Sequence, residues 1–238
     1  MMDFSGMKEL TIGGVKLREL SVGGVKVWQA GRLPAGYTEV EYIRLDGNSW
    51  FDTKVNPADY PAGIEYRFKG RRLAQNSTND YLWGCLVNGR RSGNVAINNN
   101  SGYTVLYLSN SSSILKRAPI PEYDTFFEVY LKATSMDAAN AVFEFNGVPF
   151  SNVFEPSNAE MPNGNIYLGY CPNVGSTSRP FIGDICPFTM TNPVDGSPIL
   201  DYVSCIRNSD GAVGMFDLVL GRFDGNAGTG TMTAGGAV

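Results

Sequence analysis

The sequence predicts an all-β fold, a two-sheet sandwich or a barrel, from three observations. Its 238 residues include 28 glycines and 13 prolines with no fixed period, which suits short strands joined by tight turns. From Tyr37 onward, alternating apolar and polar segments follow one another almost without a pause. No window of ~10 residues or more carries a sustained helical period, so long helices are not expected.

A repeated motif occupies the amino-terminal end, where LTIGGVKL at 10–17 is followed by LSVGGVKV at 20–27. Each Gly-Gly pair predicts a two-residue turn and therefore a β-hairpin. The expected opposite pairs are Leu10 with Leu17, Ile12 with Val15, Leu20 with Val27, and Val22 with Val25. This register gives each hairpin one apolar face, which an isolated hairpin cannot bury. We expect residues 8–28 to mediate self-association or attachment to another protein, and docking on the chain's own sandwich is the alternative.

The segment from Gly31 to Gly36 breaks the pattern and predicts a boundary between residues 1–32 and residues 33–238. The second unit opens with a strand over 37–45, in which Glu39 and Glu41 share one side, and Asn146-Gly147 is a strong hairpin turn. The glycine-rich tail over 221–236 has no phosphate-loop pattern and indicates turns and an extended end. Other strands are expected at 50–55, 63–68, 81–87, 94–98, 103–109, 125–133, 141–145, 148–153, 165–169, 181–190 and 201–206.

Composition excludes several classes of function. The net charge is −4 and no basic run exceeds a pair, so no nucleic-acid partner is expected. The chain has no histidine, which excludes nucleophile systems and metal sites that need one. No segment approaches the roughly 20 apolar residues of a membrane helix, so no membrane insertion is expected. No secretory signal is recognisable at the amino-terminal end.

Several segments of the second unit resemble one known family. These are the opening LPAGYTEVEYI at 33–43 with Phe51-Asp-Thr53, the strand pair within 126–150, the segments 165–169 and 181–185, and the run 201–230. They are similar to the concanavalin A-like, laminin G-like domains of phage, prophage and gut-bacterial surface proteins. The resemblance implies a two-sheet antiparallel jelly-roll sandwich, preceded here by the small amino-terminal hairpins.

The resemblance also implies a function. We expect a phage or prophage structural protein with a non-catalytic module that binds a host surface or a carbohydrate, on a virion or an extracellular surface. One alternative is a purely structural capsid or tail decoration without a small ligand. The other alternative is a carbohydrate-active hydrolase. The family is functionally diverse, so its fold alone does not decide between them.

The candidate ligand-binding residues are tyrosines that share a strand face with polar groups. Tyr103 and Tyr107 lie on one face of a predicted strand, and Tyr130 is the expected neighbour; a ring can stack on a sugar there. The alternative is that these rings fill the sandwich, as we expect for Trp83.

Catalysis is not expected. Hydrolases of this fold set alternating carboxylates on one strand, so that acid and nucleophile share a cleft. The nearest match, Glu39-x-Glu41, lacks a third acid, and Glu144 is followed by an asparagine.

No cofactor and no metal are expected. The acidic candidates for calcium are Asp46, Asp52 and Asp184, and no acidic cluster has the density of an EF-hand loop. The four cysteines form no C-x-x-C pair and are expected to be small apolar residues of buried strands. A disulfide such as Cys171–Cys186 stays open among Cys85, Cys171, Cys186 and Cys205.

Overall fold

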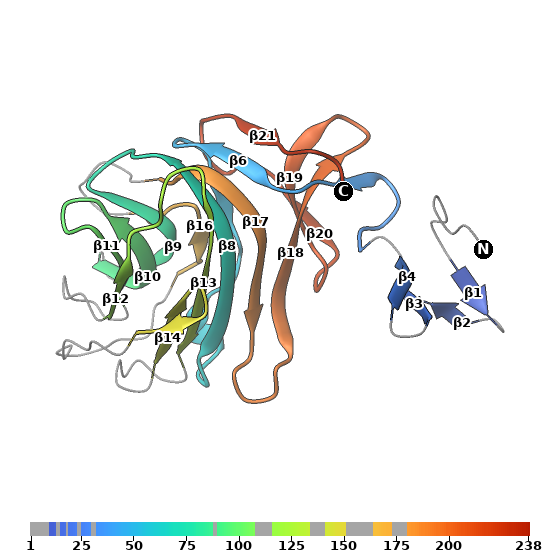
Figure 1. The fold of residues 1–238 in the computed structure, drawn as a ribbon, viewed down its shortest axis with the longest axis horizontal. Helices are drawn as coiled ribbons and strands as arrows, with labels where there is room; N and C mark the ends of the chain where they lie inside the picture. Colours follow the sequence, from blue (N-terminus) through green and yellow to red (C-terminus); the bar gives the residue numbers. More distant parts are fainter. Residues whose placement is uncertain are drawn as a thin grey trace.

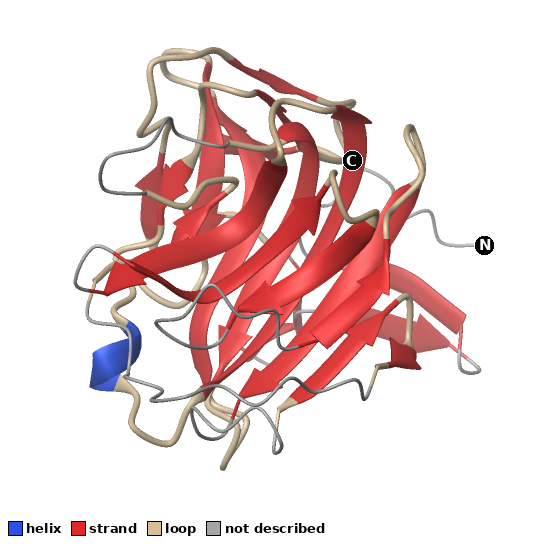
Figure 2. Ribbon diagram, turned by 90° about the vertical axis from the view of Figure 1, so that its left-hand side faces the viewer, coloured by secondary structure: helices blue, strands red, loops and turns tan. Residues whose placement is uncertain are grey.

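The molecule is a sandwich of two antiparallel sheets, as the sequence predicts (Figures 1 and 2). The computed structural model describes residues 10–12, 15–17, 19–22, 25–29, 32–87, 90–107, 116–133, 141–150, 164–172 and 180–238. The backbone alone is described for the strands within 10–29 and for residues 86–87, 90–93, 107 and 116. In this part of the chain the only helix is a 3-10 turn, η1 (Pro57–Asp59), and no helix is long and apolar enough to cross a membrane.

The larger sheet contains 11 strands, which come from both the amino-terminal and the carboxyl-terminal parts of the sandwich. Its main path is β15 (Val148–Pro149), β14 (Val142–Phe145), β13 (Phe126–Ala133), β8 (Ile64–Ala74), β17 (Ile182–Thr191), β18 (Pro198–Arg207), β19 (Ala212–Asp217) and β20 (Arg222–Asp224). Three further strands pair beside this path: β5 (Tyr37–Glu39) with β18, and β6 (Ile43–Asp46) with both β17 and β21 (Met232–Ala234). The smaller sheet packs against its inner face.

The smaller sheet runs in the order β12, β11, β10, β9, β16, β7. Its strands are β12 (Lys116–Pro119), β11 (Tyr103–Tyr107), β10 (Arg90–Asn98), β9 (Asn79–Val87), β16 (Tyr167–Leu168) and β7 (Phe51–Asp52). Both sheets end on one side at short or proline-bearing strands, because Pro119 closes β12 and Pro149 lies in β15. Proline has no amide hydrogen to offer to a further strand.

The core between the sheets is built from aromatic rings. The ring of Phe68 on β8 lies 5.9 Å from Trp83 on β9 and 5.8 Å from Phe127 on β13. Phe188 on β17 lies 5.8 Å from Trp83. All four side chains are buried, so the prediction that Trp83 belongs to the core is confirmed.

Strand β17 changes one of its neighbours halfway along, and a bulge marks the change. Its first half pairs with β6 and its second half with β18, while β8 stays on the other side throughout. The register shifts between Ile185 and Phe188 at this point. A bulge adds a residue to one strand and increases its local twist. The first half of β17 is thereby held between β6 and β8.

The predicted Asn146-Gly147 turn is confirmed, and the two predicted Gly-Gly turns, at 13–14 and 23–24, lie outside the described residues. Asn146 and Gly147 have φ values of 51° and 73°, the positive pair that a tight hairpin of this kind requires. The two amino-terminal hairpins form separate two-stranded sheets, β1 (Leu10–Ile12) with β2 (Val15–Leu17) and β3 (Glu19–Val22) with β4 (Val25–Gln29). The confirmed pairs are Leu10 with Leu17, Ile12 with Val15, and Val22 with Val25.

Two predictions about short elements were wrong. Leu20 lies opposite Trp28 rather than Val27, because a register shift next to Ser21 makes the pairing skip one residue. The tail is not only turns and an extended end: β20 pairs with β19, and β21 pairs with β6. Strands of three residues are held by backbone pairing and are too short to show a side-chain alternation.

Candidate functional site

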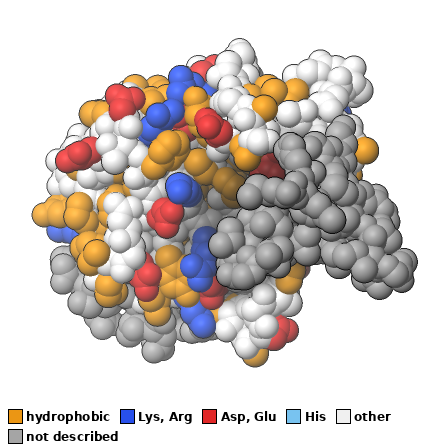
Figure 3. Space-filling model, turned by 45° about the vertical axis from the view of Figure 1, so that its right-hand side comes forward, with side chains coloured by type: hydrophobic (Ala, Val, Ile, Leu, Met, Phe, Trp, Pro, Cys, Tyr) orange, Lys and Arg blue, Asp and Glu red, His pale blue; other side chains and the backbone are white. Residues whose placement is uncertain are grey.

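The outer face of the larger sheet carries an alternating row of charged side chains. On β8, Ile64, Tyr66 and Phe68 are buried toward the core. Successive side chains of a strand point to opposite faces, so the residues between them point outward. The outward residues of β8 are Glu65, Arg67, Lys69 and Arg71. On the side of the molecule shown in Figure 3, basic and acidic side chains are interspersed with apolar ones.

Tyr130 lies on this outer face, on the third strand from one margin of the sheet. On β13 it stands opposite Glu144 of β14 on one side and Arg67 of β8 on the other. The guanidinium carbon of Arg67 lies 4.6 Å from the centre of the Tyr130 ring, and Arg67 also donates to Glu65 at 2.9 Å. Burial raises the pKa of Tyr130, and the negative charge of Glu65 raises it further. The positive charge of Arg67 acts in the opposite direction and is outweighed. The Tyr130 hydroxyl is therefore protonated at neutral pH.

A groove of about 380 Å³ opens around Tyr130. Its charged rim includes Lys69 and Glu128, whose charged atoms are 3.3 Å apart and whose side chains are 49% and 64% exposed. Both groups can therefore exchange water for a ligand. The groove is lined by Arg67, Phe68, Lys69, Glu128, Val129, Tyr130, Glu144, Gly147, Pro187 and Thr189.

Next to this groove, two arginines share one buried aspartate. Asp184 on β17 pairs in register with Arg44 of β6 and Arg71 of β8. Arg44 donates from Nε to Oδ1 at 2.7 Å and from Nη2 to Oδ2 at 3.1 Å. Arg71 donates from Nε to Oδ2 at 2.8 Å and also from Nη2. The side chain of Asp184 is 0% exposed, whereas Arg44 is 41% and Arg71 23% exposed. We call these three residues the arginine–aspartate triad.

Two aromatic rings flank the triad. Tyr42 lies 5.4 Å from the guanidinium carbon of Arg44 and 5.2 Å from that of Arg71, measured to the ring centre. Phe126 lies 4.8 Å from Arg71 and is 40% exposed. The hydrogen bonds to Asp184 raise the pKa of both arginines against the effect of burial. Both guanidiniums are therefore held charged and in a fixed orientation.

Glycine is required beside the buried aspartate. Gly183 precedes Asp184 on β17, and a Cβ atom there would collide with the carbonyl oxygen of Arg71 and the ring of Phe181. The close approach of β17 to β8 at this point is what lets Asp184 reach Arg71 from the neighbouring strand. The short sequence Ile-Gly-Asp thus positions the triad.

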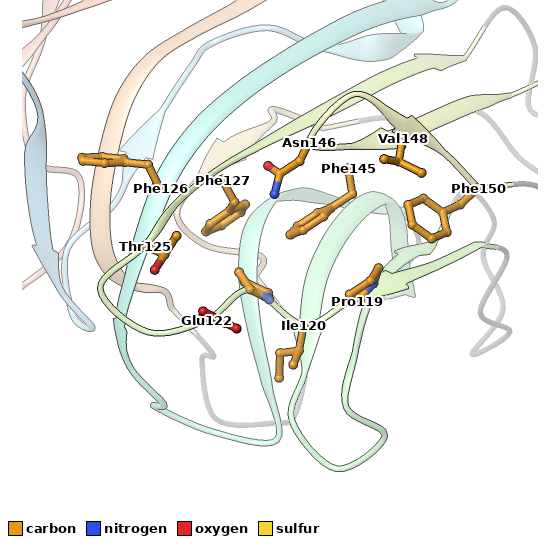
Figure 4. A pocket seen from close by; sticks show the side chains of 11 residues that line it. Pro119, Ile120, Glu122, Thr125, Phe126, Phe127, Phe145, Asn146, Val148 and Phe150 are labelled. Carbon is orange, nitrogen blue, oxygen red and sulfur yellow. The ribbon is translucent and has the colours of Figure 1, made fainter.

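A second cavity, of about 510 Å³, lies where the margins of the two sheets meet (Figure 4). In Figure 4 the rings of Phe127, Phe145 and Phe150 line one side of it, and Pro119 and Ile120 line the other. Phe127 and Phe145 stack at 5.6 Å between ring centres. This cavity is mainly apolar, so it offers few hydrogen-bonding partners to a hydroxylated ligand.

The predicted tyrosine platform is not one site. Tyr103 is 41% exposed on β11 of the smaller sheet, with Arg117 at 5.4 Å from its ring centre. Tyr130 belongs to β13 of the larger sheet, and both side chains face away from the core between the sheets. The expected closeness of Tyr130 to Tyr103 was therefore wrong, because β11 and β13 belong to different layers of the sandwich. The side chain of Tyr107 lies outside the described residues.

The two glutamates of the incomplete catalytic pattern are separated from the groove. The predicted strand over 37–45 is interrupted, since β5 ends at Glu39 and β6 begins at Ile43. Glu39 accepts a hydrogen bond from Arg32 at 2.6 Å, and Glu41 is exposed next to the carboxyl-terminal tail. The expected alternation of Glu39, Glu41 and Ile43 on one side is broken at this point. Glu144 lies in the groove itself.

The aspartates considered for calcium each accept hydrogen bonds from the protein. Burial acts to raise the pKa of Asp46, but the hydrogen bonds that it accepts, led by those from the backbone of Thr231 and Asn48, together lower it. Asp52 accepts from Lys54 and Asn165. Within the described part of the chain, no three Asp, Glu, Cys or His side chains are grouped as metal ligands.

The cysteines behave as small apolar residues. Cys85, Cys171, Cys186 and Cys205 are all buried and none forms a disulfide. Burial raises the pKa of Cys186 to about 11 and that of Cys205 to about 12.

The arginines and Lys69 of the outer face were missed by the sequence interpretation. The available signal was the alternation Glu65-x-Arg67-x-Lys69-x-Arg71 around Tyr66 and Phe68. It marks one strand with a charged and an aromatic face. Asp184 was noticed only as a candidate calcium ligand, because its partners lie far away in the sequence.

Comparison with known proteins supports the fold. No family model matches this sequence, and the comparison with curated proteins gives no match. Among solved structures, the chain is similar to a protein of Bacteroides ovatus designated a "putative carbohydrate binding protein", with 15% identity and a TM-score of 0.53 over 84% of this chain. The chain spans 61% of that protein.

Weaker likenesses extend to other proteins. Domains LG4-5 of the mouse laminin α1 chain are 14% identical with a TM-score of 0.44, and the match covers 72% of this chain and 48% of that chain. A Trypanosoma rangeli sialidase is 12% identical with a TM-score of 0.49, and the match covers 72% of this chain and 32% of that chain. Identities this low speak for the fold alone, and the TM-score is above 0.5 for the Bacteroides protein and below 0.5 for the laminin domains and the sialidase. The fold is the predicted jelly-roll sandwich.

Proposed function

We propose that this chain is a non-catalytic carbohydrate-binding module of a phage or prophage structural protein, acting on a virion or an extracellular surface. The observation that carries the proposed binding is the groove around Tyr130 on the outer face of the larger sheet. The Bacteroides neighbour, whose designation names carbohydrate binding, agrees with this reading.

The chemistry of the groove suits a sugar. Saccharides present hydroxyl groups that donate and accept, together with apolar C–H faces. Arg67 and Lys69 supply donors, Glu128 and Glu144 supply acceptors, and Tyr130 supplies a ring with a protonated hydroxyl. Hydrogen bonds with one charged partner are roughly twice as strong as neutral ones. A site rich in such pairs can select a polar ligand from water.

The same groove is poorly suited to hydrolysis. Glu128 and Glu144 are two carboxylates on neighbouring strands, the minimum that a glycosidase needs. A general acid also needs an apolar environment that keeps it protonated at neutral pH. Glu128 is instead 64% exposed and paired with Lys69. Release of reducing sugar from a bound glycan, abolished by Glu128→Gln or Glu144→Gln, would contradict the non-catalytic assignment.

The binding test is a glycan array probed with the full chain and with two tyrosine variants. Tyr130→Ala should weaken binding about ten-fold or more, since it removes the ring and the partner of Arg67. Tyr103→Ala is the matched control, because it removes an exposed tyrosine from the other sheet. Equal losses in both variants would displace the site from the groove. Absence of any bound glycan would favour the alternative of a structural decoration protein.

The amino-terminal hairpins support the structural part of the proposal. Their strands pair only within each hairpin, in two-stranded sheets that are separate from the two sheets of the sandwich among the described residues. We propose that residues 8–28 mediate self-association or attachment to another virion protein. Light scattering of the full chain and of a chain lacking residues 1–30 tests this. A full chain that is already monomeric, with hairpins protected from proteolysis, would mean that they dock on their own sandwich.

A further inference from the structure

The arginine–aspartate triad presents unused cationic donors to solvent. Asp184 accepts hydrogen bonds from Nε and Nη2 of both Arg44 and Arg71. These two nitrogens form the edge of each guanidinium that faces the carboxylate. A guanidinium has five N–H donors, so the Nη1 group of each arginine points away from Asp184. Asp184 is fully buried and cannot be reached by a ligand, while both arginines are partly exposed.

The charges of the triad do not cancel. Two guanidiniums share a single carboxylate, so the triad carries one net positive charge. Asp124 attracts Arg44 at longer range, as the last of the causes that raise the pKa of this arginine. In the neighbouring groove Arg67 pairs with Glu65 and Lys69 with Glu128, and Glu144 adds a third carboxylate. The outer face therefore has a cationic end at the triad and an end with an excess of carboxylates at Tyr130.

The triad is fixed before any ligand arrives. Each arginine is bound through two nitrogens to a carboxylate that the sheet holds in register on both sides. Tyr42 lies against both guanidiniums, and Phe126 lies against that of Arg71. Arginine side chains normally lose much rotamer freedom on binding, and this loss is avoided where they are already held. A planar fork so held matches the oxygens of a carboxylate or a sulfate.

We propose that the saccharide bound on this face is acidic, with its carboxylate or sulfate received by the Nη1 groups of Arg44 and Arg71 and its uncharged part on the Tyr130 groove. This inference rests on the proposed function and names its ligand class. Lys69 and Glu128 lie opposite each other between the two ends, because the pair of Arg71 with Phe126 is on one side of them and the pair of Arg67 with Tyr130 is on the other. The two ends thus form one continuous surface.

The first experiment measures the triad directly. Nitrogen-15 spectra of the arginine Nε–H groups are recorded during titration of the full chain with sodium glucuronate, with its uncharged methyl ester, and with glucose 6-sulfate. The signals of Arg44 and Arg71 should shift with the two acids and stay in place with the ester, while that of Arg207 stays in place throughout. A shift with glucuronate alone assigns a carboxylate, and one with the sulfate alone assigns a sulfate. No shift, or an equal shift with the ester, would contradict the assignment.

The second experiment uses the glycan array with charge variants. Arg44→Gln and Arg71→Gln should each weaken binding of acidic glycans about ten-fold, and added salt should weaken wild-type binding. Arg207→Gln is the matched control, because Arg207 pairs with Asp210 away from the triad. Arg44→Lys keeps the charge and loses the fork, so an intermediate loss is expected, and thermal melting of each variant shows that it folds.

The two proposals fail in different ways. Binding of neutral glycans that Tyr130→Ala abolishes and the arginine variants leave intact would overturn the acidic ligand and keep the carbohydrate-binding function. A chain that binds no glycan would overturn both.

Discussion

The two faces of β8 and β17 are built from the same strands and are used differently. The inner face holds rings that contact one another, such as Phe68 with Trp83 and Phe188. The outer face holds ions in cross-strand pairs, such as Lys69 with Glu128. Successive residues of a strand point to opposite faces, so a residue of the inner face, which contributes to stability, is followed by one of the outer face, which we propose contributes to binding. The difference predicts that substitutions on the two faces separate these properties.

The largest effect is expected for Phe68→Ala on the inner face. It removes a ring that contacts Trp83, Phe127, Phe181 and Phe188 and leaves a cavity. The free energy of unfolding should fall by about 3–5 kcal/mol, the usual cost of a buried phenylalanine. Denaturant titration followed by tryptophan fluorescence measures this. A loss below about 1 kcal/mol would mean that the inner face is not the main source of stability.

A smaller loss is expected for Asp184→Ala on the outer face. The two arginines would lose their shared carboxylate and repel each other, but their partial exposure lets water replace it. We expect about 2 kcal/mol less stability, of the order of a hydrogen bond to a charged group. The same titration measures it, and salt should reduce the loss by screening the repulsion. A loss as large as that of Phe68→Ala would place the triad with the core.

Cys186 lies in the bulge of β17, and its burial can be tested by the pH dependence of stability. Burial raises its pKa from 9.0 to about 11. The folded state therefore disfavours the thiolate, so this contribution to stability is complete below pH 9 and is lost as pH rises through about 11. Near pH 10 the loss is about 1 kcal/mol for this thiol. Unfolding of wild type and Cys186→Ala at pH 8 and about pH 10 should show a smaller fall in the variant, and equal falls would mean that the thiol is accessible.

The smallest effect on stability is expected for Lys69→Gln. Its ion pair with Glu128 is exposed on both sides, and such pairs contribute from nothing to about 1 kcal/mol. We expect a change below about 0.5 kcal/mol, with a measurable change in glycan binding because Lys69 lines the groove. A variant that loses stability and keeps binding would reverse the comparison between the faces.

The sequence predicted the fold well because its signals are local. The Asn146-Gly147 turn and the strand expected over 125–133 each depend on a few neighbouring residues, and both are confirmed. The site could not be assembled in the same way. Arg44, Arg71 and Asp184 come from three strands, and only the sheet order brings them into one row. Tyr103 and Tyr130 were expected on neighbouring strands, and they belong to different sheets. The layer of a strand depends on long-range pairing that no single segment shows.

The prolines at the sheet margins have a consequence for crowding. Pro119 ends β12, and Pro149 occupies the two-residue strand β15, so neither margin offers a full row of amide hydrogens to another copy. Unprotected margins are where β-proteins fuse into aggregates when their local concentration is high. Many copies displayed side by side on one surface can therefore bring these two margins close together without joining them into a continuous sheet.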